Sequence, residues 1–214
     1  MSLKVSEGLT EDGVVVGNAY DKYGSKNPIV KKIMAGFDSS LSQLVERSAP
    51  KNIHEVGCGE GYWSLQWSAQ NLKVNGSDFS PRVIEIARQN AIERGLPDDI
   101  FKVRSIYDLD EIQDKADLVV CCEVLEHLEN PELGLQTLRT IVGSHLIVSV
   151  PREPLWRALN LARGKYIRAL GNTPGHLQHW SSRSFVKFVS TCFDVVEIRK
   201  PLPWTLLLCR HKAS

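Results

Sequence analysis

The sequence contains no long apolar run and no excess of charge of one sign. No stretch approaches the roughly 20 consecutive apolar residues that a membrane-spanning helix needs, and the first residues lack the apolar core of a secretory signal peptide. The 26 basic and 25 acidic side chains leave a formal net charge of +1, which does not favour a nucleic-acid partner. We therefore expect a chain that neither spans a membrane nor binds nucleic acid.

The cysteines also lack the pattern of a disulfide framework. There are 5 of them, an odd number without paired spacing, and Cys121 and Cys122 are adjacent within an apolar run. Free thiols in a reducing compartment are the expected state. We therefore expect a cytoplasmic protein.

The length of 214 residues predicts a single domain with embellishments. Apolar residues follow at helical spacing after Asn27 and Pro28, a cap and a first-turn proline that predict the start of a helix. We divide the chain into an N-terminal segment and helix, residues 1–50, which closes over a cofactor site, and a catalytic domain, residues 51–214. An insertion at about 151–180 is expected to cover the substrate.

From residue 51 onwards, strand-like and helix-like patterns alternate. The predicted strands are 53–56, 72–77, 100–103, 118–122, 145–150, 193–199 and 204–210, and the predicted helices are 62–69, 81–94, 131–142, 156–162 and 184–190. This alternation is typical of an α/β protein with a doubly wound, mostly parallel sheet. The connection through Pro201 and Pro203 is too short for a crossover, so the last two strands are expected to form an antiparallel hairpin.

A glycine-rich turn follows the first of these strands. It reads Glu55-Val56-Gly57-Cys58-Gly59-Glu60-Gly61 and opens the next helix, where free N–H groups and positive φ angles let a ligand approach the backbone. The spacing is G-x-G-x-G rather than the G-x-G-x-x-G of dinucleotide sites. Asp78 ends the second strand, where a carboxylate can accept hydrogen bonds from both ribose hydroxyls.

These residues resemble the class I methyltransferases that use S-adenosylmethionine (SAM). The resemblance implies a seven-stranded Rossmann-like sheet of order 3-2-1-4-5-7-6 with the last strand antiparallel, and a SAM crevice between strands one and four. It implies SAM contacts at Glu55, Gly57, Cys58, Gly59, Gly61, Asp78, Phe79, Ser105, Ile106 and Cys122. The acid that many members place after strand three is missing, because Arg104 and Ser105 stand there and Asp108 follows only later.

The segment from Tyr20 to Gly24 carries two tyrosines in a loop before the first helix. Such a loop is expected to fold over the SAM pocket, with Tyr23 as the contact residue. The alternative is that these are surface aromatics without a role.

An acidic stretch follows strand four. Glu123, Glu126 and His127 have the i, i+3, i+4 spacing of one helical face, and such a set can bind Mg²⁺, Mn²⁺, Zn²⁺ or Fe²⁺. The stretch is similar to the E-x-x-E-H motif of ubiquinone-biosynthesis O-methyltransferases and of small-RNA 2′-O-methyltransferases. In the RNA group a downstream histidine completes the metal site, and this chain offers His176 and His179.

We take Glu123, Glu126, His127 and His176 as the metal set, and Glu123, His127 and His179 as the catalytic set. Two alternatives stay open. Without a metal, a histidine acts as general base toward a hydroxyl, or the cluster is purely structural.

The segment 151–170 carries five basic residues and one acidic residue, interleaved with apolar ones. It is interpreted as a lid that meets an anionic acceptor, as an amphipathic patch that rests on an anionic membrane and gives access to a lipid-like acceptor, or as a helix whose arginines are merely solvated.

The whole sequence predicts a SAM-dependent methyltransferase, with in-line transfer to the hydroxyl of a small-molecule or lipid-like acceptor. The alternatives are a C- or N-methyltransferase, an RNA 2′-O-methyltransferase, an NAD-dependent reductase, and a SAM-binding protein without turnover. The residues do not indicate an oligomeric state.

Overall fold

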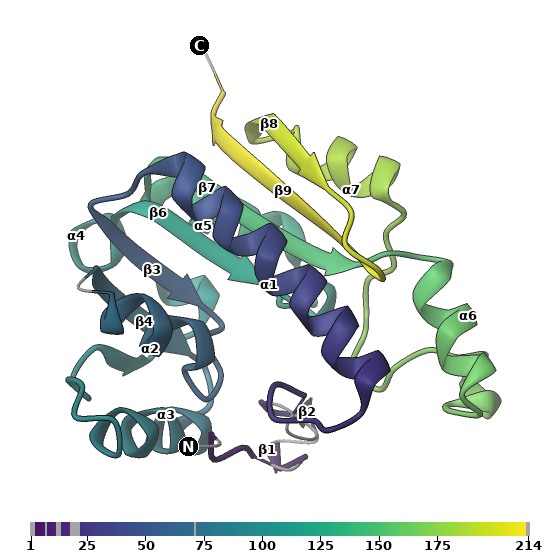
Figure 1. Cartoon of the computed structure of the whole chain (residues 1–214). Helices are drawn as coiled ribbons and strands as arrows, with labels where there is room; N and C mark the ends of the chain where they lie inside the picture. The colour runs from purple at the N-terminus through teal and green to yellow at the C-terminus, as the bar shows by residue number, and fades with distance from the viewer. Residues whose placement is uncertain (1–2, 7, 12–13, 18–21, 71, 213–214) are drawn as a thin grey trace.

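The computed structural model describes residues 3–6, 8–11, 14–17, 22–70 and 72–212. At its centre is a seven-stranded sheet in the order β5-β4-β3-β6-β7-β9-β8 (Figure 1). The strands are β3 (Asn52–Val56), β4 (Lys73–Asp78), β5 (Phe101–Val103), β6 (Ala116–Cys122), β7 (Val142–Pro151), β8 (Phe193–Arg199) and β9 (Trp204–His211). β9 is antiparallel to both of its neighbours, β7 and β8, and the other pairs of this sheet are parallel. The predicted order 3-2-1-4-5-7-6 and the final hairpin are confirmed.

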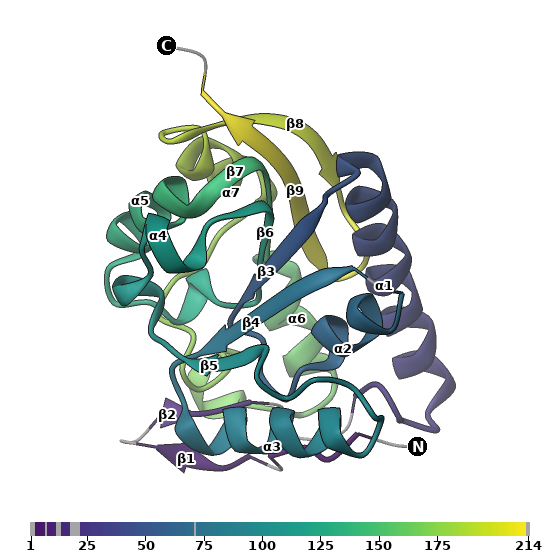
Figure 2. The same ribbon diagram turned by 90° about the vertical axis from the view of Figure 1, so that its left-hand side faces the viewer.

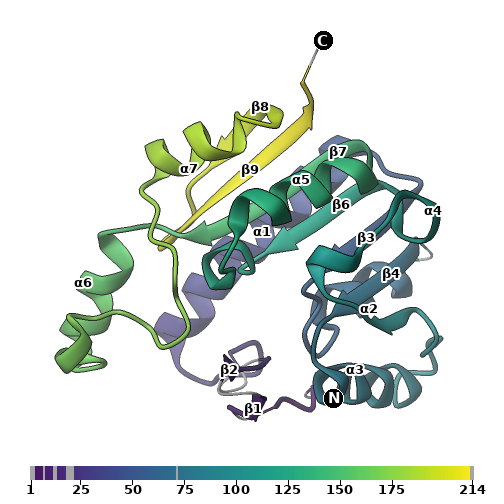
Figure 3. The same cartoon turned by 180° about the vertical axis from the view of Figure 1, so that it is seen from behind.

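Helices cover both faces of the sheet. They are α1 (Pro28–Ser48), α2 (Tyr62–Ala69), α3 (Pro81–Ile92), α4 (Glu111–Asp114), α5 (Pro131–Ile141), α6 (Leu155–Ala162) and α7 (Ser182–Val189), with short 3₁₀ turns η1 (Ile106–Asp108), η2 (Leu125–His127) and η3 (Ile167–Ala169). α1 lies across one face and α5 and α7 lie on the other (Figures 1 and 3). α1 shares its apolar core with strands of the sheet, so residues 28–48 pack as part of the same body.

α1 and α3 begin where their side-chain caps and prolines predict. The Asn27 carboxamide accepts a hydrogen bond from the amide of Ile29, and the Ser80 hydroxyl accepts one from Val83. One predicted boundary is wrong. Gly143 does not end α5; it lies in β7, where an added Cβ would come within 2.9 Å of the Ala116 carbonyl oxygen. Glycine there permits close approach to β6 rather than a helix stop.

The N-terminal segment contains a two-residue antiparallel pair, β1 (Thr10–Glu11) and β2 (Val14–Val15). This pair lies beside α3 (Figure 2). The Lys4 backbone exchanges two hydrogen bonds with the Asn90 side chain of α3. The segment is thereby attached to the body next to the glycine-rich turn.

The carboxyl ends of the parallel strands meet at one edge of the sheet, where α/β proteins bind their ligands. The residues after β7 form α6 and η3, which project from this edge (Figures 1 and 3). Among the described residues, no helix combines the length and the hydropathy needed to cross a bilayer.

Candidate active site

The glycine-rich turn joins β3 to α2 with three glycines at positive φ: Gly57 at 73°, Gly59 at 54° and Gly61 at 83°. An added Cβ would collide with Val124 at Gly57 and would lie 2.6 Å from Phe101 at Gly61, whereas at Gly59 it would meet no atom within 4 Å. Two of the glycines therefore allow the turn to pack, and the third exposes backbone to open space. This is the surface that a ligand can approach.

Asp78 connects this turn to the end of β4. Its Oδ2 accepts a hydrogen bond from the Gly59 amide at 3.1 Å and its Oδ1 accepts one from the Ser80 amide at 3.0 Å. The neighbouring Phe79 is 51% exposed, an unusual state for a large apolar ring that suits stacking against a base.

Glu55 supports the turn from below. One of its carboxylate oxygens accepts hydrogen bonds from both the backbone amide and the hydroxyl of Ser64, in the first turn of α2. Burial raises the pKa of Glu55 to about 8, against the lowering effect of Ser64. Its predicted contact with SAM stays a prediction, and the geometry adds a role in holding the start of α2.

Tyr23 reaches α2 from the N-terminal segment. Its ring stacks on Tyr62 with centroids 3.5 Å apart and meets Trp63 edge-on at 5.6 Å. Burial raises the pKa of Tyr23 well above its usual range, and the nearby carboxyl of Asp38 adds to the increase. Tyr20 lies outside the described residues.

The remaining predicted SAM contacts lie at the ends of β5 and β6. The Ser105 hydroxyl accepts a hydrogen bond from the Tyr107 amide, and Ile106 packs into the core with α5, so little of its side chain is exposed. Cys122 is buried at the end of β6. Arg104, which directly precedes Ser105, forms ion pairs with Asp110 and Asp114.

Glu126, His127 and His176 form a compact group in which one ligand atom from each residue lies within 4.8 Å of the others. Glu126 and His127 come from η2, and His176 comes from the insertion after β7. The expectation that Glu123 shares one helical face with them is wrong. Glu123 has a φ of 60° and precedes the 3₁₀ turn, so it is not a member of this group.

The carboxylate of Glu126 is buried without a hydrogen bond from another described residue to offset the loss of water. It is 1% exposed, and neither of its oxygens accepts a hydrogen bond from another of the described residues. Its backbone carbonyl accepts hydrogen bonds from Leu177 and Gln178, which attaches the histidine-bearing loop to η2. Burial raises the pKa of the Glu126 carboxyl, and the charge of Glu123 raises it further. A cation beside Glu126 would offset the free-energy cost of burying its charged carboxylate.

The two histidines present neutral imidazoles to Glu126. His127 Nδ1 lies 2.9 Å from the Gly175 carbonyl oxygen, so it carries the proton and leaves the Nε2 lone pair free. The His176 ring packs edge-on against His127 at 4.9 Å, and burial, with smaller effects of its histidine neighbours, lowers its pKa to about 3. One carboxylate and two neutral imidazoles are a donor set that divalent ions accept.

His179 lies outside this group. It is exposed, and its Nε2 is 2.7 Å from the Asn172 carboxamide oxygen. Of the two histidines that the sequence offered, the fold therefore brings His176 to Glu126 and directs His179 elsewhere.

Glu123 faces a different pair of residues. Its Oε2 accepts a hydrogen bond from the Trp204 indole at 2.6 Å, and its Oε1 accepts one from the Ser149 hydroxyl at 3.1 Å. Burial raises the pKa of Glu123 to about 7, while Lys22 and the two hydrogen bonds act in the opposite direction. Sequence reasoning missed Trp204, because no motif marks a residue that arrives from the final hairpin.

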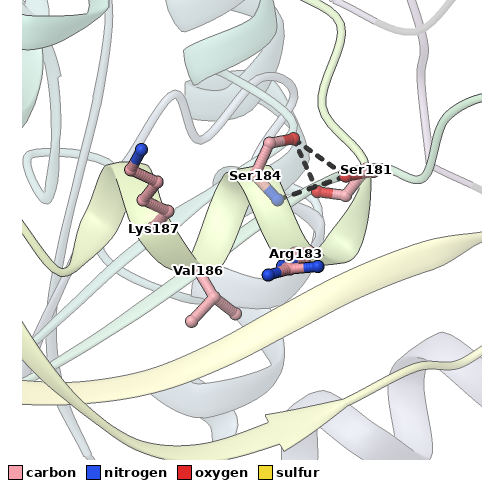
Figure 4. A pocket seen from close by; sticks show the side chains of 5 residues that line it. All are labelled: Ser181, Arg183, Ser184, Val186 and Lys187. Atoms are coloured by element: carbon pink, nitrogen blue, oxygen red, sulfur yellow. Dashed lines mark hydrogen bonds between the residues drawn. The ribbon is translucent and has the colours of Figure 1, made fainter.

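A surface hollow lies on α7, lined by Ser181, Arg183, Ser184, Val186 and Lys187 (Figure 4). Hydrogen bonds between Ser181 and Ser184 cap the helix there. None of the predicted site residues lines this hollow.

The sheet order, the turn at Gly57–Gly61 and the carboxylate of Asp78 define a class I SAM-dependent methyltransferase. A family model described as a methyltransferase domain matches residues 32–190, and the chain belongs to this family. Membership of this family excludes the alternative of an NAD-dependent reductase.

Curated relatives carry the same kind of domain. A ubiquinone biosynthesis O-methyltransferase from Xanthomonas euvesicatoria pv. vesicatoria (strain 85-10) is 28% identical over 143 residues, which are 65% of this chain and 58% of the relative. One from Shewanella halifaxensis (strain HAW-EB4) is 33% identical over 102 residues, 48% of this chain and 43% of the relative. The chain thus spans about half the length of the curated relatives it matches.

Solved structures show the same fold. Magnesium protoporphyrin IX methyltransferase from Synechocystis PCC 6803, with bound S-adenosylhomocysteine (SAH), has a TM-score of 0.67 at 23% identity and covers 88% of this chain and 90% of that chain. The N-methyltransferase NodS from Bradyrhizobium japonicum WM9, in complex with SAH, has a TM-score of 0.64 at 17% identity, with coverages of 91% and 94%. At these identities the likeness concerns the fold alone.

Proposed function

We propose that the chain transfers the methyl group of SAM to a hydroxyl oxygen of a small molecule, with a divalent metal ion beside the acceptor. The observation that carries this proposal is the group of Glu126, His127 and His176 at the carboxyl end of β6, next to the cofactor crevice. Methyl transfer to carbon or sulfur does not require a metal at this place. The name of the ubiquinone biosynthesis relatives supports an oxygen acceptor.

The residues of the crevice hold and orient the cofactor. The exposed backbone at Gly59 faces the amino-acid end of SAM, Asp78 accepts the ribose hydroxyls, and Phe79 stacks on the adenine. SAM, when bound, supplies a methyl group on a positively charged sulfur. Transfer breaks the sulfur–methyl bond and forms an oxygen–methyl bond, so the products are SAH, the methylated acceptor and a proton.

Glu126, His127 and His176 would hold the metal, and the buried, uncompensated carboxylate fits such an ion. The ion would lower the pKa of an acceptor hydroxyl. Without it, the free Nε2 of His127 is placed to take the hydroxyl proton as general base, because Gly175 orients the ring. Glu123 would position the acceptor on the cofactor side.

The N-terminal segment is proposed to close the crevice. The Ser6 amide and hydroxyl both bind the Glu60 carboxylate within the glycine-rich turn, at 3.0 and 2.8 Å, and Tyr23 stacks on Tyr62 at the start of α2. The segment is therefore attached on both sides of the cofactor loop. The part of residues 1–50 that precedes α1 would act as a cover for residues 51–214, whereas α1 packs on the sheet.

The test uses the purified chain with SAM and a panel of phenolic and aliphatic alcohols, with SAH formation and product mass as readouts. We expect an O-methylated product whose formation falls with a strong chelator and in Glu126→Ala and His127→Ala. Methylation at nitrogen or carbon would contradict the proposed acceptor atom. Unchanged turnover in chelator, with His127→Ala inactive, would favour the general base over the metal.

A further inference from the structure

Two carboxylates three positions apart have different environments. Glu126 is buried with both oxygens free of hydrogen bonds from other described residues, beside His127 and His176. Glu123 has both of its oxygens occupied, by Trp204 and Ser149. Only one of the two acids is therefore available to the histidine group.

Trp204 is well placed to impose this difference. It is the first residue of β9, is almost fully buried, and is packed against Phe37 at 4.9 Å and Trp156 at 6.0 Å between ring centroids. An indole N–H can only donate, so a fixed indole dictates where its carboxylate partner lies. The Glu123 backbone amide also donates to the Ser149 carbonyl, which fixes Glu123 at its positive φ.

The donor set decides which ion a site prefers. Mg²⁺ takes oxygen ligands in octahedral geometry, whereas imidazole suits Zn²⁺, Fe²⁺ and related transition ions. A second carboxylate in the group would add the oxygen donors that Mg²⁺ requires. Its absence leaves two imidazoles and one carboxylate.

We propose that Trp204 is a specificity-determining residue, which holds Glu123 away from Glu126, His127 and His176 and so makes their site a poor one for Mg²⁺ and a good one for transition metal ions. The inference rests on the metal part of the proposed function. It does not concern the SAM crevice.

The test compares Trp204→Phe with Trp63→Phe in the full chain after removal of metal by a chelator. Both variants keep an aromatic ring beside Phe37, but Trp63 donates its indole proton to Asp38 instead of Glu123. Calorimetric titrations with MgCl₂, MnCl₂ and ZnCl₂ give the affinities, and the absorption spectrum with CoCl₂ reports the coordination. Thermal melting checks that each variant is folded.

We expect Trp204→Phe to raise the Mg²⁺ affinity by about tenfold, at the lower end of what outer partners of metal ligands contribute, and to change the Co²⁺ spectrum. Trp63→Phe should leave the ratio of Zn²⁺ to Mg²⁺ affinity unchanged. In a Glu123→Gln background, Trp204→Phe should no longer alter that ratio, because the residue acts through Glu123.

An unchanged ratio of Zn²⁺ to Mg²⁺ affinity in Trp204→Phe would overturn the inference while leaving the metal site intact. An equal change of this ratio in both tryptophan variants would do the same. If the unmodified chain binds none of the ions, the metal part of the proposed function and this inference fall together. SAH binding, measured in the same calorimeter, then shows whether the methyltransferase function stands.

Discussion

Asp78 Oδ2 accepts a hydrogen bond from the Gly59 amide at 3.1 Å and so joins the ends of β3 and β4 at the cofactor crevice. This contact places the carboxylate beside the Gly59 backbone, where an added Cβ would meet no atom within 4 Å.

Asp78→Ala is expected to weaken SAH binding by roughly 10- to 100-fold, because charge-assisted hydrogen bonds contribute about 1.5–3 kcal/mol. Isothermal titration calorimetry with SAH measures the effect. Asp108→Ala is the matched control, since this acid lies in η1 after β5 and is not assigned to the ribose. Unchanged affinity in Asp78→Ala, or an equal loss in Asp108→Ala, would contradict the assigned ribose contact.

Alanine at Gly61 and at Gly59 should have different consequences. At Gly61 the added Cβ would lie 2.6 Å from the Phe101 ring, so the melting temperature falls strongly. At Gly59 the loss of folding stability is limited to that of alanine in a left-handed backbone conformation, about 1–2 kcal/mol. The added methyl group enters the ligand space, so SAH affinity drops. Melting curves and calorimetry on both variants separate the two effects. The reverse ranking would show that the open side of the turn has been misassigned.

His176→Ala should abolish Zn²⁺ binding by the chain, and His179→Ala should preserve it. The reason is that His176 lies within 4.8 Å of the other two donors, whereas His179 is exposed and paired with Asn172. Both variants are titrated with ZnCl₂ after removal of metal. Loss of binding in His179→Ala alone would reverse the choice between them.

The stability of the chain without cofactor should decrease more steeply with rising pH than that of Glu55→Gln. Burial raises the pKa of Glu55 from 4.5 to about 8. Between these values the unfolded chain has released a proton that the folded chain retains, so rising pH favours unfolding and the stabilisation is lost by about pH 8. Urea denaturation at several pH values measures the difference. Parallel curves for the two proteins would show that Glu55 ionises normally.

The projecting insertion should bind anionic vesicles at low salt. Ile167 and Leu170 are 63% and 67% exposed at its tip, and Arg163, Lys165 and Arg168 lie beside them in the chain. Flotation with phosphatidylglycerol vesicles tests the binding.

An Ile167→Asp/Leu170→Asp variant should stay in solution in the flotation assay. Ile112→Asp on α4, where the native side chain is 95% exposed, should float like the unmodified chain. If the unmodified chain does not float, the membrane interpretation is wrong and a lid over a soluble acceptor is favoured.

Most of the sheet could be predicted because its signals are local. Apolar segments of strand length, and caps such as Asn27 and Ser80, act over a few residues and appear in the structure where the pattern places them. The spacing of Glu123, Glu126 and His127 wrongly predicted one shared face, because that prediction requires a helix. The chain instead turns at Glu123, where the backbone enters the left-handed region.

The sequence by itself determined the glycine-rich turn, the carboxylate at the end of the next strand and the order of strands and helices, since each depends on neighbouring residues and on the geometry of parallel crossovers. Only the tertiary structure decided that Glu126 meets His176 and that Glu123 meets Trp204. The contacts that set this arrangement join residues separated by 48 positions, between His127 and Gly175, and by 81 positions, between Glu123 and Trp204. Such partners come together only when the insertion and the final hairpin pack against the sheet, and no local pattern encodes that packing.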